Sequence, residues 1–78
     1  MTEQQIQSKR IKQLESEGYY VIKLTQTNKN GIPDLVALKH DDVLFVEVKT
    51  PKGRLSKLQE YRLKELKQHG FKTEVFRG

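Results

Sequence analysis

Apolar residues recur along the chain with two periods, and the change of period predicts six elements. A stripe on one side of a helical wheel predicts helices over 2–17 and 55–69. Short apolar or alternating runs predict strands over 19–24, 35–38, 43–46 and 71–76. A helix between the last two strands permits a parallel crossover. We therefore expect an α/β domain in which two helices flank a mixed sheet of about four strands.

Both predicted helices carry start and stop signals. Thr2 and Ser56 stand at the N-cap positions, and Gln5 and Gln59 follow them at the three-residue spacing of a capping box. A glycine follows each helix, as is common where a helix ends. These signals predict the helix boundaries independently of the apolar stripe.

A polar tetrad joins the two central apolar runs and favours a hairpin. With the turn centred between Asp41 and Asp42, the numbers of paired residues sum to 83, so Asp34 faces Lys49. Glu47 lies two residues before Lys49, and side chains alternate along a strand. The hairpin is therefore expected to place Asp34, Glu47 and Lys49 on one face, an arrangement that a register shift of one residue would break.

Two carboxylates and an ammonium group in a partly apolar hairpin suggest a metal-binding or catalytic site. Carboxylates about 4 Å apart repel by roughly 4 kcal/mol at an effective dielectric constant near 20. Lys49 offsets part of this repulsion, and a divalent cation offsets more, since Mg²⁺ prefers carboxylate oxygen and water. The alternative is an exposed Asp34–Lys49 pair with Glu47 in solvent. These residues alone leave both interpretations open.

Polar residues also fall within the apolar arcs of both predicted helices. Glu3 lies inside the arc of the first helix, with Glu17 as a rival at the far end. An acid in the first turn is also favoured by the helix dipole and often points to water. Gln59 interrupts the stripe of the second helix, where a buried amide needs hydrogen-bond partners. It either closes the capping box or reaches the acidic site.

Length and composition narrow the class of protein. With 78 residues, the chain is expected to be one domain spanning 1–78, of marginal stability. It has no cysteine, which excludes disulfides and thiolate metal sites, and its two histidines argue against zinc. No apolar stretch reaches membrane-spanning length, and residues at the N-terminus do not form the apolar region of a signal peptide. We expect a cytoplasmic protein that neither binds a membrane nor uses an organic cofactor.

The charge favours a polyanionic partner. Fifteen lysines and arginines against ten acids leave a net charge of +5. Lys52, Arg54 and Lys57 follow directly on the candidate site and are expected to bind backbone phosphates. Lys29, in the polar loop over 25–33, is a further candidate for phosphate binding, with a solvated loop as the alternative.

The candidate motifs together resemble a known family. The string comprises Gly31-Ile32-Pro33-Asp34, Val46-Glu47-Val48-Lys49, Gly53-Arg54-Leu55-Ser56 and Gln59. It resembles the VRR-NUC (virus-type replication-repair nuclease) family of the PD-(D/E)xK nuclease superfamily. The resemblance runs from Glu3 to the last strand. It implies a small restriction-endonuclease-like core and Mg²⁺- or Mn²⁺-dependent hydrolysis of DNA phosphodiester bonds.

The resemblance also implies roles for individual residues. Asp34 and Glu47 match the metal-binding acids, and Lys49 matches the catalytic lysine. Glu3 matches the acid of the first helix, which favours it over Glu17, and Gln59 matches a glutamine close to the active site. The Val48 carbonyl would join the metal ligands. Small members of the family imply a homodimer acting on branched DNA such as four-way (Holliday) junctions.

Two other functions compete with the nuclease. A non-catalytic DNA-binding or adaptor module would use the same basic charge, but acids beside phosphate bring it no benefit. A sequence-specific restriction-type enzyme would need a base-reading insertion, for which the chain has little room. The expected function is therefore a metal-dependent, structure-selective DNA endonuclease.

Overall fold

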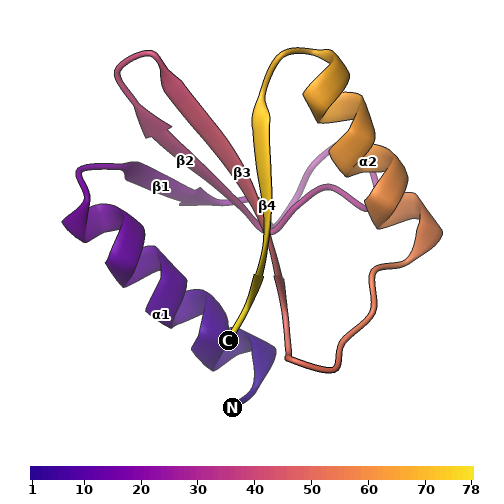
Figure 1. Ribbon diagram of the computed structural model, residues 1–78, viewed down its shortest axis with the longest axis horizontal. Coiled ribbons are helices and arrows are strands. Elements are labelled where there is room, and N and C mark those ends of the chain that lie inside the picture. The colour runs from indigo at the N-terminus through magenta and orange to yellow at the C-terminus, as the bar shows by residue number, and fades with distance from the viewer.

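The computed structural model describes all of residues 1–78 and contains the six expected elements in the expected order (Figure 1). The helices are α1 (Glu3–Ser16) and α2 (Lys57–Gln68), and the strands are β1 (Tyr20–Lys23), β2 (Leu35–Lys39), β3 (Asp42–Lys49) and β4 (Lys72–Arg77). The sheet order is β1-β2-β3-β4, with only the β3–β4 pair parallel. The predicted α/β fold with a four-stranded mixed sheet is confirmed.

Both helices begin with the predicted capping boxes. Thr2 Oγ1 accepts from Gln5 N at 3.2 Å and Ser56 Oγ accepts from Gln59 N at 3.1 Å. In turn, each glutamine Oε1 accepts a hydrogen bond of 2.9 Å from the backbone N–H of the cap residue. Each box therefore satisfies two donors that the helix itself cannot pair. Neither helix combines the length and the apolar character needed to cross a bilayer.

The two helices cover opposite faces of the sheet (Figure 1). Ile6 and Leu14 of α1 are fully buried against the main core cluster, whose sheet members are Leu35, Ala37, Val46 and Val48. Because alternate residues of a strand point to opposite faces, Glu47 and Lys49 lie on the other face, which α2 covers beside β3 and β4. The hydrophobic core thus turns the acidic residue of β3 toward α2.

The hairpin register differs from the predicted one. Observed pairs such as Leu35↔Val46 and Lys39↔Asp42 sum to 81, and the turn consists of His40 and Asp41. Asp41 adopts a φ of 58°, a left-handed conformation that aspartate tolerates, so the turn closes in two residues. The predicted sum of 83 was therefore wrong by two residues. An even shift preserves the faces, which is why the expected grouping survives.

The long connection between β1 and β2 leaves the sheet and lies against α2 (Figure 1). Arg62 Nε of α2 donates to the Asn30 carbonyl at 2.9 Å. Gly31 has a φ of 78°, and a Cβ at this position would lie 2.6 Å from Leu58 Cγ. Gly31 is therefore needed both for its backbone conformation and for the close approach of the loop to α2.

Gly31→Ala should destabilise the protein more than Gly70→Ala. Both substitutions impose a left-handed conformation on alanine, at about 1–3 kcal/mol. Only the first also creates a clash, since nothing lies within 4 Å of a Cβ at Gly70. Urea denaturation followed by circular dichroism measures both losses. Adding Leu58→Ala should recover part of the Gly31→Ala loss, and equal losses in the two alanine variants would contradict the proposed close approach.

Candidate active site

Asp34 is held at the end of the β2–β3 ladder by two hydrogen bonds. Its carbonyl accepts from Leu24 N at 2.8 Å, which attaches it to the chain leaving β1. Its Oδ2 accepts from Val48 N, also at 2.8 Å. The preceding Pro33 is buried and fixes the backbone before the carboxylate. The Asp34 side chain thus takes the place of a backbone partner for β3.

Glu47 is the buried acid of the site. Its side chain is directed to the α2 face, and the residue is only 2% exposed. Gln59 Nε2 of α2 donates to Glu47 Oε2 at 3.4 Å, while no donor of the protein reaches Oε1. Gln59 therefore does both things that its position in the helix suggested, since it closes the capping box and contacts the acidic site. One buried carboxylate oxygen is left without a partner.

The environment of Glu47 strongly disfavours its charge. Burial, followed by hydrogen bonding with Asp34 and the negative charge of Asp34, raises the pKa of Glu47 to about 8. Lys49 lowers this pKa and Glu3 raises it further. Without a bound cation, Glu47 thus retains its proton at neutral pH. Two adjacent carboxylates that resist full ionisation are common in catalytic sites.

The residues present fit a divalent cation. The unpartnered Oε1 of Glu47 lies beside the carboxylate of Asp34, and a divalent cation would take the place of the proton that Glu47 otherwise retains. Val48 donates its N–H toward Asp34, and a strand residue presents its carbonyl on the same side as its N–H. These oxygens suit Mg²⁺, which keeps several water ligands. No three carboxylate or imidazole side chains gather in a metal-binding group, so two acids would supply the side-chain ligands.

The two acids of α1 lie at opposite ends of the helix. Glu3 begins α1 and is exposed, yet its charge is close enough to contribute to the raised pKa of Glu47. Glu17 caps the other end, where it contributes to the raised pKa of Tyr19. Glu3 thus lies at the margin of the site and Glu17 lies away from it. Of the two interpretations of Glu3, its exposure favours a first-turn acid that faces water, while Ile6, Leu14 and Ile11 make the contact with the core.

A basic segment adjoins the acidic pair. Lys49 ends β3 half-buried on the same face as Glu47, and the exposed residues Lys52, Arg54 and Lys57 follow it. Arg77 of β4 supports the loop that joins β3 to α2. Its Nη1 donates to the Thr50 carbonyl at 3.2 Å and also to the Gly53 carbonyl. This support was not predicted, because no local motif marks Arg77 and its partners lie more than twenty positions earlier.

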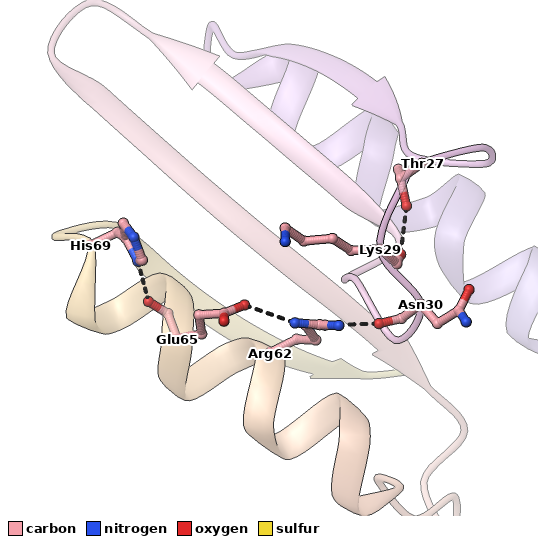
Figure 2. Close-up of polar contacts among 6 residues, drawn as sticks. All are labelled: Thr27, Lys29, Asn30, Arg62, Glu65 and His69. Carbon is pink, nitrogen blue, oxygen red and sulfur yellow. Dashed lines mark hydrogen bonds and ion pairs between the residues drawn. The ribbon is translucent and has the colours of Figure 1, made fainter.

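Lys29 is placed apart from this basic segment. It lies in the loop before β2, beside the C-terminal half of α2, where it borders a depression together with Glu65 and His69 (Figure 2). The basic segment instead leads into the N-terminus of α2. The structure thus brings Asp34, Glu47, Lys49 and Gln59 together and separates Lys29 from them.

The raised pKa of Glu47 predicts a pH-dependent loss of stability in metal-free buffer. Between the ordinary glutamate value of 4.5 and about 8, the unfolded chain releases a proton that the folded chain retains. Stability therefore falls as pH rises through this window and levels off above it. Glu47→Gln should lack this contribution, so its melting temperature relative to wild type should increase from pH 5 to pH 8. Glu60→Gln, at an exposed acid of α2, is the control, and a constant difference for Glu47→Gln would contradict the assignment.

Comparison with known proteins identifies the family. The family model of the VRR-NUC domain matches residues 1–78, the whole chain. No match was found among curated proteins. The match agrees with the four-stranded α/β core and with the acids gathered at the end of the β2–β3 hairpin. The chain therefore belongs to the VRR-NUC family and forms a nuclease-type domain whose expected substrate is DNA.

Proposed function

We propose that the protein is a Mg²⁺- or Mn²⁺-dependent endonuclease that hydrolyses phosphodiester bonds of branched DNA, such as four-way junctions. One observation carries the proposal. Glu47 is buried beside the half-buried Asp34 and has an unpartnered carboxylate oxygen, and Lys49 follows on the same face. A buried polar atom without a partner costs free energy. A pair of acids with a purely structural role would therefore be expected to have both carboxylates fully hydrogen-bonded.

The metal would be held by oxygen atoms at the end of the hairpin. Asp34, Glu47 and the Val48 carbonyl are the proposed ligands, and Glu3 could approach from the start of α1. A bound divalent ion polarises a phosphoryl oxygen and lowers the pKa of a coordinated water. Val48 N–H and Gln59 fix the orientation of the two acids through their hydrogen bonds. The ligand oxygens are thus positioned before any ion arrives.

Lys49 supplies positive charge at the reacting phosphate. Its ammonium group would donate to a phosphoryl oxygen or orient the attacking water, and charge that develops in the transition state strengthens such an interaction. Its half-buried position beside Glu47 restricts the side chain to this end of the sheet. Asp34, Glu47, Lys49, Glu3 and Gln59 are therefore the proposed catalytic set.

The basic residues around the site would bind the DNA backbone. Lys52, Arg54 and Lys57 lie next to Lys49 in sequence, and Arg77 holds their loop in place. Lys29 would bind phosphate farther along the strand. Interactions of this kind give affinity without sequence discrimination. They therefore favour selection by DNA shape over selection by base sequence.

Branched DNA further suggests a homodimer. Each chain carries one acidic site, whereas resolution of a four-way junction requires a cut in two strands. Two copies related by a twofold axis would supply two equivalent sites. A small domain of this size also gains stability from association.

Cleavage assays with catalytic variants test the proposed function. Wild type should cut a labelled four-way junction in Mg²⁺ or Mn²⁺ but not in EDTA, and should leave a matched linear duplex largely intact. Lys49→Ala and Asp34→Asn should each slow cleavage by about 10²-fold or more while junction binding is retained. Lys64→Ala, at an exposed position of α2, is the matched control. Binding without cleavage under every metal condition would instead support a non-catalytic DNA-binding module.

Salt dependence tests the proposed phosphate binding by the basic segment. Replacing Lys52 or Arg54 by alanine should weaken junction binding uniformly across sequences. Each replacement should also reduce the slope of log K against log salt by about 0.9, because one phosphate fewer is neutralised. Lys12→Ala, at an exposed position of α1, is the control and should leave the slope unchanged. Fluorescence anisotropy at several salt concentrations measures the slope, and an unchanged slope in both loop variants would exclude this segment from the DNA interface.

A further inference from the structure

A depression of about 390 Å³ lies beside the C-terminal half of α2, apart from the acidic pair. Its walls come from three segments: the loop before β2, the end of α2 and the residue that precedes β4. Figure 2 shows the Lys29 side chain extending from the loop toward the part of α2 that carries Glu65 and His69. The lining residues are Lys29, Ile32, Glu65, Leu66, His69 and Phe71.

The lining combines apolar surface with polar groups at the margin. Ile32, Leu66 and Phe71 form the apolar part. The Phe71 ring packs edge-to-face on Phe45, with ring centroids 5.8 Å apart, yet Phe71 remains 41% exposed. An aromatic ring that is fixed by one neighbour and open to solvent can stack on a planar ligand.

Hydrogen bonds hold the polar part of the depression in place (Figure 2). Arg62 donates to the Asn30 carbonyl at 2.9 Å and pairs with Glu65 at 3.1 Å, so it joins the loop to the helix. Thr27 Oγ1 donates to the Lys29 carbonyl at 2.7 Å. His69 Nδ1 lies 2.8 Å from the Glu65 carbonyl, which can only accept. Nδ1 therefore carries a hydrogen and donates, and in this tautomer Nε2 can accept.

These groups favour a nucleobase over a phosphate as the ligand. The Glu65 carboxylate and the negative end of the α2 dipole both repel an anion inside the depression. A base offers an apolar face to Phe71 and amino hydrogens to Glu65 and His69. Lys29, at the margin, would then bind the phosphate attached to that base. Carboxylate recognition of an exocyclic amino group is an established mode of base binding.

We propose that this depression binds one unpaired base of the DNA strand that enters the active site. The inference rests on the proposed function in that DNA is the ligand. Gln59 and Glu65 are six residues apart on α2, about 9 Å along the helix. This distance corresponds to the rise of two or three stacked nucleotides, about 3.4 Å each. A paired base is stacked inside the duplex and cannot enter, so the site selects DNA with unpaired nucleotides beside the cleaved bond.

Binding measurements with Phe71→Leu test the proposal. Leucine keeps an apolar contact with Phe45 but removes the stacking ring. The probes are a labelled duplex with a three-nucleotide single-stranded flap and a fully paired duplex of equal length, both in EDTA. Phe71→Leu should weaken flap binding about tenfold and leave duplex binding within about twofold. Tyr20→Leu, at a tyrosine that is 71% exposed on β1, is the matched control and should bind both probes like wild type.

A second variant tests the proposal independently of any misfolding of Phe71→Leu. Glu65→Gln retains the shape of the side chain and should weaken binding of flaps with cytosine or adenine more than of flaps with thymine. Equal losses on flap and duplex, or no loss on either, would overturn the proposal. A changed sedimentation behaviour of Phe71→Leu would also overturn it, by assigning the depression to an interface between two copies. Because binding is measured without metal, failure of cleavage and failure of this site are distinguishable.

Discussion

The hydrogen bond from Val48 N–H to the Asp34 carboxylate is the interaction on which the site depends. The β2–β3 ladder ends at the pair Leu35↔Val46. By the same register Val48 would pair with Pro33, which has no N–H to donate to the Val48 carbonyl, so this pair cannot form both ladder bonds. The Asp34 side chain accepts the Val48 N–H instead, and the two strands separate at this point. The Asp34 carboxylate, the buried Glu47 and the Val48 carbonyl thus come together where regular strand pairing stops.

This arrangement lowers the folding stability of a small domain. Glu47 is buried with one oxygen unpaired, and its pKa of about 8 means that the folded protein resists its ionisation. The two helices limit the cost in different ways. α1 supplies the main core on the far face of the sheet, while α2 brings Gln59 to the acidic pair. Loss of stability at a site of this kind is common where chemistry requires an unfavourable arrangement of charges.

Several site residues were predicted because their positions follow from strand alternation. Asp34, Glu47 and Lys49 share a face although the predicted register was wrong by two residues, since an even shift leaves the faces unchanged. The orientation of Glu3 was left open by the sequence, because an acid within an apolar arc can still lie in solvent when it begins the helix. The separation of Lys29 from the other cations depends on the path of an irregular loop, for which the sequence has no periodic signal.

The sequence by itself determined the elements, their caps, the family and the set of candidate acids. These depend on residues a few positions apart, such as the Ser56–Gln59 capping box, or on motif strings read along the chain. Only the tertiary structure decided the burial of Glu47, the support of the basic loop by Arg77 and the depression next to Phe71. The physical reason is that desolvation and packing depend on which distant segments exclude water together, and in this chain those segments are brought together by the sheet and by α2.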